Sequence, residues 1–368
     1  MTTKPMSRPM PSYLLDRGYK VWNHAEEPLI RQPTSILNHN NNNHSYSHHT
    51  HTNHSHNDNR KDLGKLIEEE VTEKRRNGFN LSNPYLNTLE VDKLYHLGLT
   101  KKGDNLVKKF GDVKFVCTGE SVSRMELTAT ILKHKLNLTE PVEKINQDVD
   151  RFTIYKVGPI LCVNHGIGVP SLTILLNEIF KLLAYARCQN VTIFRLGTCG
   201  SIGKPPGALI ITNKVVDDRQ RPLFEQVVLG RVVSLEATVD QELVEELRTI
   251  GGTQLSELTI ETGTTMATND FYEGQGRMNG AFCGHTFAER GRHLLSLKKA
   301  GIINIEMEAN AFFALCTKAK LKCACVDVVV CDRLRGDMSN IDSDQFTLFE
   351  QRPALLISKY IQRHMDLN

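Results

Sequence analysis

The strongest constraint on the fold is an alternation between short apolar runs of strand length and longer segments with helical spacing, which begins near residue 83. The predicted strands are 113–117, a pair within 152–164 joined at Gly158-Pro159, 191–196, 208–212, 258–262 and 324–330. The predicted helices are 125–136, 171–186, 241–248, 285–300, 309–318 and 353–364. Strands that alternate with helices favour a single α/β domain in which helices cover a mixed sheet.

The first 60 residues differ in character from the rest of the chain. Residues 38–59 are almost entirely Asn, His, Ser and Thr, so they cannot bury enough apolar surface to offset the entropy lost on ordering. We therefore predict a low-complexity, disordered tail over 1–60, whose histidines take no part in catalysis. The charged stretch that follows predicts an exposed lead-in helix over 61–82, ahead of the domain at 83–368.

Composition limits the classes of function. The 368 residues are 40% hydrophobic and 24% charged, and their net charge of +3 gives no electrostatic reason to expect a nucleic acid or a polybasic membrane contact. The sequence has no apolar stretch long enough to span a bilayer and no signal-peptide pattern at Met1. Its nine cysteines, without a CxxC pair, predict buried reduced thiols rather than disulfides or a zinc site. The expectation that follows is a cytoplasmic location.

The segment FYEGQGR at 271–277 places an amide and a guanidinium two residues apart. In an extended segment both side chains would project the same way. Gln275 can bond an N–H and one carbonyl of a uracil-like ring, and Arg277 can donate to the other carbonyl. Phe271 can lie against the face of the ring. The segment therefore predicts a pyrimidine-binding pocket.

Arginines near strand ends are candidate anion ligands. Arg195 closes a buried run and is followed by Gly197 and Thr198, so its guanidinium, the hydroxyl and exposed N–H groups can hold an oxyanion. Arg124 follows the first predicted strand at a turn into a helix, and Arg151 is a third candidate. Sequence spacing leaves open whether the fold brings the three together or leaves Arg124 and Arg151 as surface charges.

The segment NIEME at 304–308 has two carboxylates on either side of Met307. Each carboxylate can accept two hydrogen bonds, which suits the vicinal hydroxyls of a ribose. The apolar residues around Glu306 and Glu308 predict partial burial, and a buried carboxylate requires a polar partner. The alternative is a pair of surface glutamates.

Taken together, these segments resemble the uridine phosphorylases of the nucleoside phosphorylase superfamily, the animal enzymes most of all. The similarity covers roughly residue 83 to the C-terminus. It rests on separate runs in the same order, which are YHLGL (95–99), SRM (123–125), DRFTIYKVGP (150–159), HGIGVPS (165–171), RLGTCGSIG (195–203), FYEGQGR (271–277), NIEME (304–308) and QRP (351–353). The resemblance implies a single domain around a central mixed, partly barrel-like sheet flanked by helices.

The resemblance also implies a reaction, the reversible phosphorolysis of uridine to uracil and ribose 1-phosphate, without a metal or an organic cofactor. It implies a homodimer, because each site would take residues from the neighbouring subunit. The roles it assigns are phosphate binding for Arg124, Arg195, Thr198 and the partner subunit's Arg151, base binding for Phe271, Gln275 and Arg277, and ribose binding for Met307, Glu308 and the partner subunit's His96.

Glu120 stands where the family's phosphate loop has a glycine, whose missing side chain lets backbone N–H groups approach the anion. At about 4 Å and an effective dielectric of about 20, a carboxylate beside a phosphate charge costs about 4 kcal/mol, which is roughly a thousandfold in affinity. Glu120 is also able to pair with Arg124 and occupy the anion site itself. The alternative function is therefore an impaired paralogue that binds a nucleoside or a base.

Asp332 is a second departure from the family pattern, because uridine-specific members have an asparagine before the arginine that matches Arg333. Bacterial-type purine members have an aspartate there, which protonates the leaving base. Asp332 and Arg333 are thus candidate secondary base contacts, which would broaden the range of bases that Gln275 and Arg277 favour. A nucleoside hydrolase is a further alternative that the set of phosphate-binding arginines disfavours.

Overall fold

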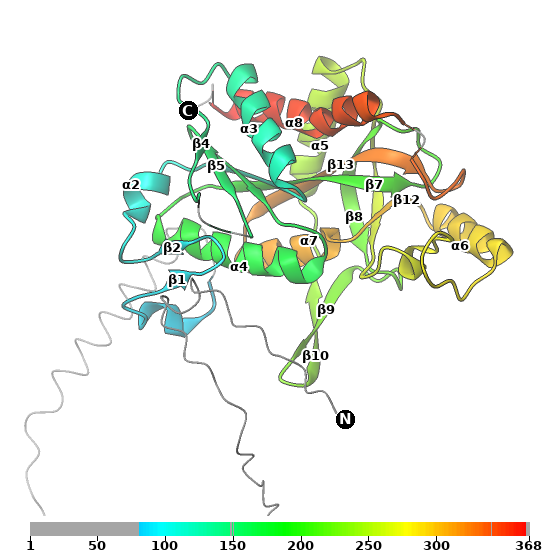
Figure 1. Ribbon diagram of the computed structural model, residues 1–368, viewed down its shortest axis with the longest axis horizontal. Coiled ribbons are helices and arrows are strands. Elements are labelled where there is room, and N and C mark those ends of the chain that lie inside the picture. Colours follow the sequence, from blue (N-terminus) through cyan, green and yellow to red (C-terminus); the bar gives the residue numbers. More distant parts are fainter. Residues whose placement is uncertain (1–80, 148, 150, 340, 366–368) are drawn as a thin grey trace, which may run out of the picture. The chain divides into compact units, whose positions relative to one another are not determined.

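A nine-stranded mixed sheet forms the centre of the domain in the computed structural model, which describes residues 81–147, 149, 151–339 and 341–365 (Figure 1). Its strands are β3 (Phe115–Gly119), β4 (Glu143–Lys144), β5 (Ile154–Val157), β6 (Ile160–Asn164), β7 (Thr192–Ser201), β8 (Leu209–Val216), β11 (Ile260–Ala267), β12 (Ile302–Glu306) and β13 (Lys322–Asp332). The strand order is β12-β11-β8-β13-β7-β3-β6-β5-β4, and β12 also pairs with β7. That extra pairing closes part of the sheet into a ring, from which β3, β6, β5 and β4 extend.

The strand directions and the closed ring confirm the predicted mixed, partly barrel-like sheet. β7 pairs in parallel with both β3 and β13, whereas β8 is antiparallel to β13. The predicted tail over 1–60 and the predicted lead-in helix up to residue 80 lie outside the described residues. Residues 81 and 82, the last two of that predicted helix, have no regular secondary structure.

Helices cover the sheet on both sides (Figure 1). They are α2 (Leu106–Phe110), α3 (Val122–Lys135), α4 (Val169–Tyr185), α5 (Gln241–Gln254), α6 (Phe287–Lys299), α7 (Ala309–Ala319) and α8 (Ser343–Met365). α8 packs on α3 and α5, and α4 packs on α7. Because helices lie on both faces, consecutive residues of β7 such as Ile193 and Phe194 are both buried, which is why the run reads as continuously apolar.

Short elements that the sequence did not predict complete the domain. A 3-10 turn, η2 (Pro84–Asn87), precedes a small hairpin of β1 (Lys93–Leu94) and β2 (Leu99–Thr100). A longer hairpin of β9 (Leu223–Val228) and β10 (Arg231–Glu236) forms a separate two-stranded sheet. Most of its residues are partly or fully exposed, so it lacks the apolar run by which the buried strands could be recognised.

Two helix starts place residues of the candidate site. Ser121 caps α3 by accepting a hydrogen bond from the backbone N–H of Arg124 at 3.2 Å, so Arg124 lies in the first turn directly after β3. α7 begins directly after Glu308, and the Glu306 carboxylate accepts from the backbone N–H groups of Glu308 at 2.8 Å and Ala309 at 2.9 Å. Glu306 thus satisfies N–H groups that have no partner within the helix.

Two predictions of local structure were wrong. The sequence predicts a loop from Gly197 to Gly203, but β7 continues to Ser201 because β13 pairs with it along its whole length. The sequence also predicts an extended segment at 271–277. Instead, Glu273–Gln275 form a 3-10 turn, η3, and Gly276 follows with φ 64°, a left-handed conformation that favours glycine.

Candidate active site

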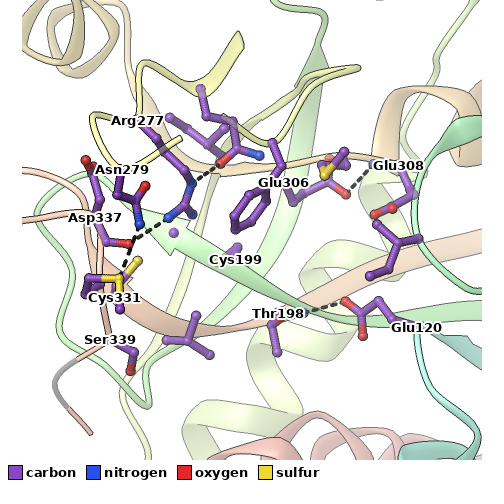
Figure 2. Close-up of a pocket in the computed structure, with 18 residues that line it drawn as sticks. Glu120, Thr198, Cys199, Arg277, Asn279, Glu306, Glu308, Cys331, Asp337 and Ser339 are labelled. Carbon is purple, nitrogen blue, oxygen red and sulfur yellow. Dashed lines mark hydrogen bonds between the residues drawn. The ribbon is translucent and has the colours of Figure 1, made fainter. Parts of the chain in front are cut away.

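A cavity of about 350 Å³ lies beside the ring of strands (Figure 2). Residues from β7, from the ends of β12 and β13, and from the segments 271–279 and 337–339 form its walls. This volume suits a small organic ligand. The predicted site residues that line the cavity are Glu120, Thr198, Phe271, Gln275, Arg277, Met307 and Glu308.

Phe271, Gln275 and Arg277 line one end of the cavity, which we call the base end. Gln275 is 2% exposed and Arg277 is 7% exposed, so both polar groups are largely removed from bulk water. Arg277 Nε donates to Gln275 Oε1 at 3.4 Å, and the Arg277 guanidinium lies 3.9 Å from the centroid of the Phe271 ring. The turn at η3 therefore brings together the three residues that the sequence predicted to act together.

Asp337 holds the base end in place, and the sequence analysis missed it. Its Oδ1 accepts from Arg290 Nη2 at 2.8 Å and from Arg333 Nη2 at 3.1 Å, and its backbone oxygen accepts from Arg277 Nη1 at 2.6 Å. Arg333 also donates to Gln275 Oε1 at 3.3 Å and to the Gln275 backbone oxygen at 2.9 Å. The signal that could have revealed this cluster is the run of charged residues directly after the last buried strand.

The base end carries an excess of positive charge, because this contact network has three guanidiniums and one carboxylate. The Asp337 carboxylate pairs with Arg290 and Arg333, whereas Arg277 bonds the Asp337 backbone oxygen. Burial lowers the pKa of Arg277 and of Arg333. Both remain cationic at neutral pH, since the ordinary pKa of arginine lies far above it. A ligand group that becomes negative at this end would be stabilised by these cations.

Arg195 lies at the opposite side of the site, fully buried among carboxylates. Its Nη1 is 3.1 Å from Glu306 Oε2 and 3.0 Å from Asp327 Oδ1, and its Nη2 makes a short contact with Glu308 Oε2. Glu308 also accepts a hydrogen bond from the backbone N–H of Gly168 at 2.6 Å. These contacts explain how a charged residue is tolerated within β7, where the sequence predicts the end of a strand.

Three of the four residues predicted to bind an anion, Arg124, Arg195 and Thr198, meet at Glu120. Glu120 Oε1 accepts from the backbone N–H of Thr198 at 3.1 Å (Figure 2). The same oxygen lies 3.9 Å from Arg195 Nη2. Glu120 Oε2 forms an ion pair with Arg124 Nη1, and Glu350 of α8 forms a second ion pair with the same guanidinium. The carboxylate of Glu120 thus makes the contacts that an inorganic anion would make with these groups.

Comparison with known proteins identifies the family. A model of the phosphorylase superfamily matches residues 114–362. This chain belongs to the phosphorylase superfamily. Within it, the chain groups with the animal uridine phosphorylases, and it is 44% identical over 291 residues to uridine phosphorylase 2 of Homo sapiens, a match that covers 78% of this chain and 92% of that protein.

Two similar proteins come from Schistosoma mansoni. The crystal structure of its uridine phosphorylase in complex with thymidine has a TM-score of 0.75 and 38% identity, and covers 78% of this chain and 99% of that chain. A protein named inactive uridine phosphorylase B is 37% identical over 282 residues, which cover 77% of this chain and 95% of that protein. Membership of the superfamily is therefore compatible with activity and with its loss, and activity has to be argued from the site.

Six residues that the uridine phosphorylase resemblance implicates do not line the cavity. Arg124, Arg195 and Arg333 lie behind its wall, in contact with Glu120, Glu308 and Gln275, which do line it, and the other three are His96, Arg151 and Asp332. His96 Nδ1 lies 2.8 Å from Glu178 Oε1, and Arg151 is exposed. Both are residues for which the resemblance predicts a place in a neighbouring subunit's site. The Asp332 carboxylate accepts a hydrogen bond from the backbone N–H of Gly203 at 2.9 Å and thereby stabilises a turn. Asp332 does not line the cavity.

No metal-binding cluster occurs among the described residues, as no three His, Cys, Asp or Glu side chains gather in a suitable arrangement. In the same part of the chain, no helix combines the length and the apolar character needed to cross a membrane. Eight of the nine cysteines are buried, Cys283 is exposed, and none forms a disulfide. The histidine-rich segment of the tail lies outside the described residues.

Glu306 should make the stability of this phosphorylase-superfamily chain depend on pH. Burial raises the pKa of Glu306 to about 8 despite the attraction of Arg195. An unfolded glutamate titrates near pH 4.3, so between about pH 4.3 and 8 the folded state holds the extra proton and the free energy of unfolding falls as pH rises, by about 1.4 kcal/mol per unit. Urea unfolding of the wild type and of Glu306→Gln from pH 5 to 8 measures this slope. The variant should lose it, and an unchanged slope would contradict the assignment.

Proposed function

We propose that this chain catalyses the reversible phosphorolysis of uridine to uracil and ribose 1-phosphate. The observation that carries the proposal is the buried pair of Gln275 and Arg277 at the positively charged end of the cavity. Uracil becomes anionic as its bond to the ribose breaks, so cationic donors favour the leaving base over the bound nucleoside. The similarity to uridine phosphorylases, one of them crystallised with thymidine, supports a pyrimidine nucleoside as the substrate.

The orientation of the Gln275 amide determines how the base would be bound. Gln275 Oε1 already accepts from Arg277 and from Arg333, so the amide NH₂ is the edge left for a ligand. We expect this NH₂ and the outer N–H groups of Arg277 to donate to the two carbonyl oxygens of uracil. The uracil ring would lie against Phe271, in place of the Arg277 guanidinium that covers that ring here.

The ribose would lie between the base end and Glu120, next to Met307 and Glu308, both of which line the cavity. Glu308 is held by Arg195 and by the backbone N–H of Gly168, so it is positioned before a substrate arrives. Arg124, Arg195 and Thr198 would hold phosphate once Glu120 swings aside. We further propose a cytoplasmic homodimer in which the partner subunit's His96 and the partner subunit's Arg151 complete each site.

The contacts of Glu120 favour a second candidate function, a paralogue that binds a nucleoside or a base and has lost phosphorolysis. Phosphate can reach the arginines only by displacing a carboxylate that is already bonded to Arg124 and to the Thr198 backbone. The base end does not depend on Glu120, so uracil binding would survive this loss.

A phosphorolysis assay at varied phosphate separates the two candidates. We expect uridine to give uracil and ribose 1-phosphate, and thymidine to give thymine and 2-deoxyribose 1-phosphate, at rates that rise with phosphate concentration. Inosine should not be cleaved. Size-exclusion chromatography with light scattering tests the dimer in the same samples. Binding of uracil without uracil release, in the presence or absence of phosphate, would reject the phosphorylase and leave the binding protein.

Arg277→Met should lower kcat for uridine cleavage by about 10²–10³-fold, since it removes a buried donor to the leaving base. Steady-state kinetics with uridine measures the loss. Arg335→Met is the matched control, because Arg335 lies in the segment after β13 but has a side chain that is 89% exposed. Equal effects of the two substitutions would argue against a direct contact between Arg277 and the base.

A further inference from the structure

The arginines on the anion side of the cavity are already outnumbered by carboxylates of the chain. Five carboxylates contact only two guanidiniums. Burial raises the pKa of both Glu306 and Asp327, and even with both of them protonated three negative charges oppose two positive ones. The carboxylates are Glu306, Glu308 and Asp327 around Arg195, Glu350 beside Arg124, and Glu120 between the two arginines. The anion side of the site is therefore net negative before any ligand binds.

A nearby histidine does not change this balance. His165 is fully buried, and burial together with the charges of Arg195 and Arg124 lowers its pKa well below the ordinary value. The imidazole is thus neutral at physiological pH and adds no positive charge. Within the described residues neither of its ring nitrogens has a hydrogen-bond partner, so it is not a cation held by a carboxylate.

The two ends of the cavity have opposite charge. The base end has three guanidiniums for one carboxylate, whereas the anion side has more carboxylates than guanidiniums. Figure 2 shows Arg277 and Asp337 at one end and Glu120 with Thr198 at the other. Cleavage of a nucleoside makes the base negative and the ribose positive, so this field favours the transition state without any added anion.

The negative charge of the anion side affects the binding of phosphate and of water differently. A phosphate anion next to Glu120 loses roughly a thousandfold in affinity for each like-charge pair at contact distance. A water molecule carries no charge and avoids that loss. The Glu120 side chain is 16% exposed and lines the cavity, so water reaches it. Its Oε1 accepts one hydrogen bond, from Thr198, and a carboxylate oxygen can accept about two.

We propose that this chain also hydrolyses uridine when phosphate is absent, with water as the nucleophile and the Glu120 carboxylate as its base, an inference that goes beyond the proposed phosphorolysis and rests on its uridine pocket. The water oxygen forms the bond to the anomeric carbon as the bond from that carbon to uracil N1 breaks. The electron pair of the breaking bond leaves with uracil, and the proton of the water passes to Glu120. Glu120 then releases this proton to solvent and the uracil anion takes one up from solvent, which leaves uracil and ribose as products and restores the carboxylate.

In the sequence analysis, the set of phosphate-binding arginines argues against a nucleoside hydrolase. In the folded domain these arginines have another role. Arg124 and Arg195 hold Glu120 and Glu308 in place, and the carboxylates face the positive charge that develops on the ribose. Phosphate is not needed to fill the space between the arginines, because Glu120 already pairs with Arg124 and approaches Arg195.

The test is uracil release from uridine in buffer freed of phosphate, with the sugar product identified by chromatography. We expect the full-length protein to form uracil and free ribose without phosphate, and Glu120→Gln to lose at least 100-fold of this rate. Glu120→Asp, which keeps the charge, should retain part of it. Glu245→Gln is the control, because Glu245 lies on the exposed surface of α5 and, among the described residues, pairs with Arg248 and Thr249 of the same helix and not with the cavity.

Each outcome bears on a different proposal. Uracil release that needs phosphate and yields ribose 1-phosphate overturns hydrolysis and supports phosphorolysis. Release of uracil and ribose without phosphate, lost in Glu120→Gln, supports hydrolysis. No release under either condition, with uracil binding intact by calorimetry, overturns hydrolysis and phosphorolysis together. Calorimetric uracil binding by Glu120→Gln establishes that the variant has folded, so a lost rate reports on the carboxylate.

Discussion

Replacing Glu120 with glycine should tighten phosphate binding by about a thousandfold, because it removes a like charge of roughly 4 kcal/mol from the anion site. The structure shows why the effect should be large. Glu120 pairs with Arg124, accepts from the Thr198 backbone and approaches Arg195, so its removal frees three groups for phosphate at once. A glycine would also let backbone N–H groups approach the anion.

Calorimetry with inorganic phosphate and the phosphate dependence of uracil release both measure this change. Glu120→Gln separates charge from bulk, since it removes the charge and leaves a side chain of similar size. We expect glutamine to recover part of the gain and glycine all of it. If Glu120→Gly bound phosphate no better than the wild type, the carboxylate would have to lie outside the phosphate position. Under the hydrolytic proposal, the same variant also loses phosphate-free turnover.

Arg195→Met should cost about 3–5 kcal/mol in the free energy of unfolding, since it leaves buried carboxylates without their counter-charge. Arg195 is fully buried and contacts Glu306, Glu308 and Asp327. Methionine fills similar space, so packing alone does not explain a loss of this size. Denaturant unfolding at pH 7 measures the change.

Asp327→Asn is the matched control for Arg195→Met. It removes one buried charge but leaves Arg195 with its other carboxylates, so stability should change by less than about 1 kcal/mol or increase. A loss for Asp327→Asn as large as that for Arg195→Met would show that packing around β7 and β13, rather than charge balance, determines the stability here.

The fold could be predicted wherever apolar residues recur with the regular spacing of a strand or a helix. The predicted strand pair joined at Gly158-Pro159 became β5 and β6, and the apolar helices at 171–186 and 309–318 became α4 and α7 with shifts of one or two residues at some ends. The glycine-rich part of β7 could not be predicted, because its strand conformation comes from pairing with β13, a partner distant in sequence. The hairpin of β9 and β10 was missed for a related reason. Its strands form by pairing with each other, and their sequences lack the apolar pattern that marks a buried strand.

The site was predictable where one short segment carries several functional groups. Phe271, Gln275 and Arg277 meet at the cavity as the segment FYEGQGR suggests, although through a turn rather than an extended strand. Asp337 and Arg290 could not be predicted in the same way, because Arg290 lies inside α6 and meets Asp337 only in the folded domain. The contacts of Asp327 with Arg195 depend likewise on strands brought together by the sheet.

The closure of β12 onto β7 also affects how the sheet avoids self-association. A strand at a sheet edge presents unpaired N–H and C=O groups that can template pairing with another molecule. In the described part of the chain β12 has a neighbour on each side, and the open extension ends at β4, which has only two residues, Glu143 and Lys144, both exposed. A short, charged edge is a poor template for strand addition. Protection against edge-to-edge aggregation is therefore built into the topology of this nine-stranded sheet.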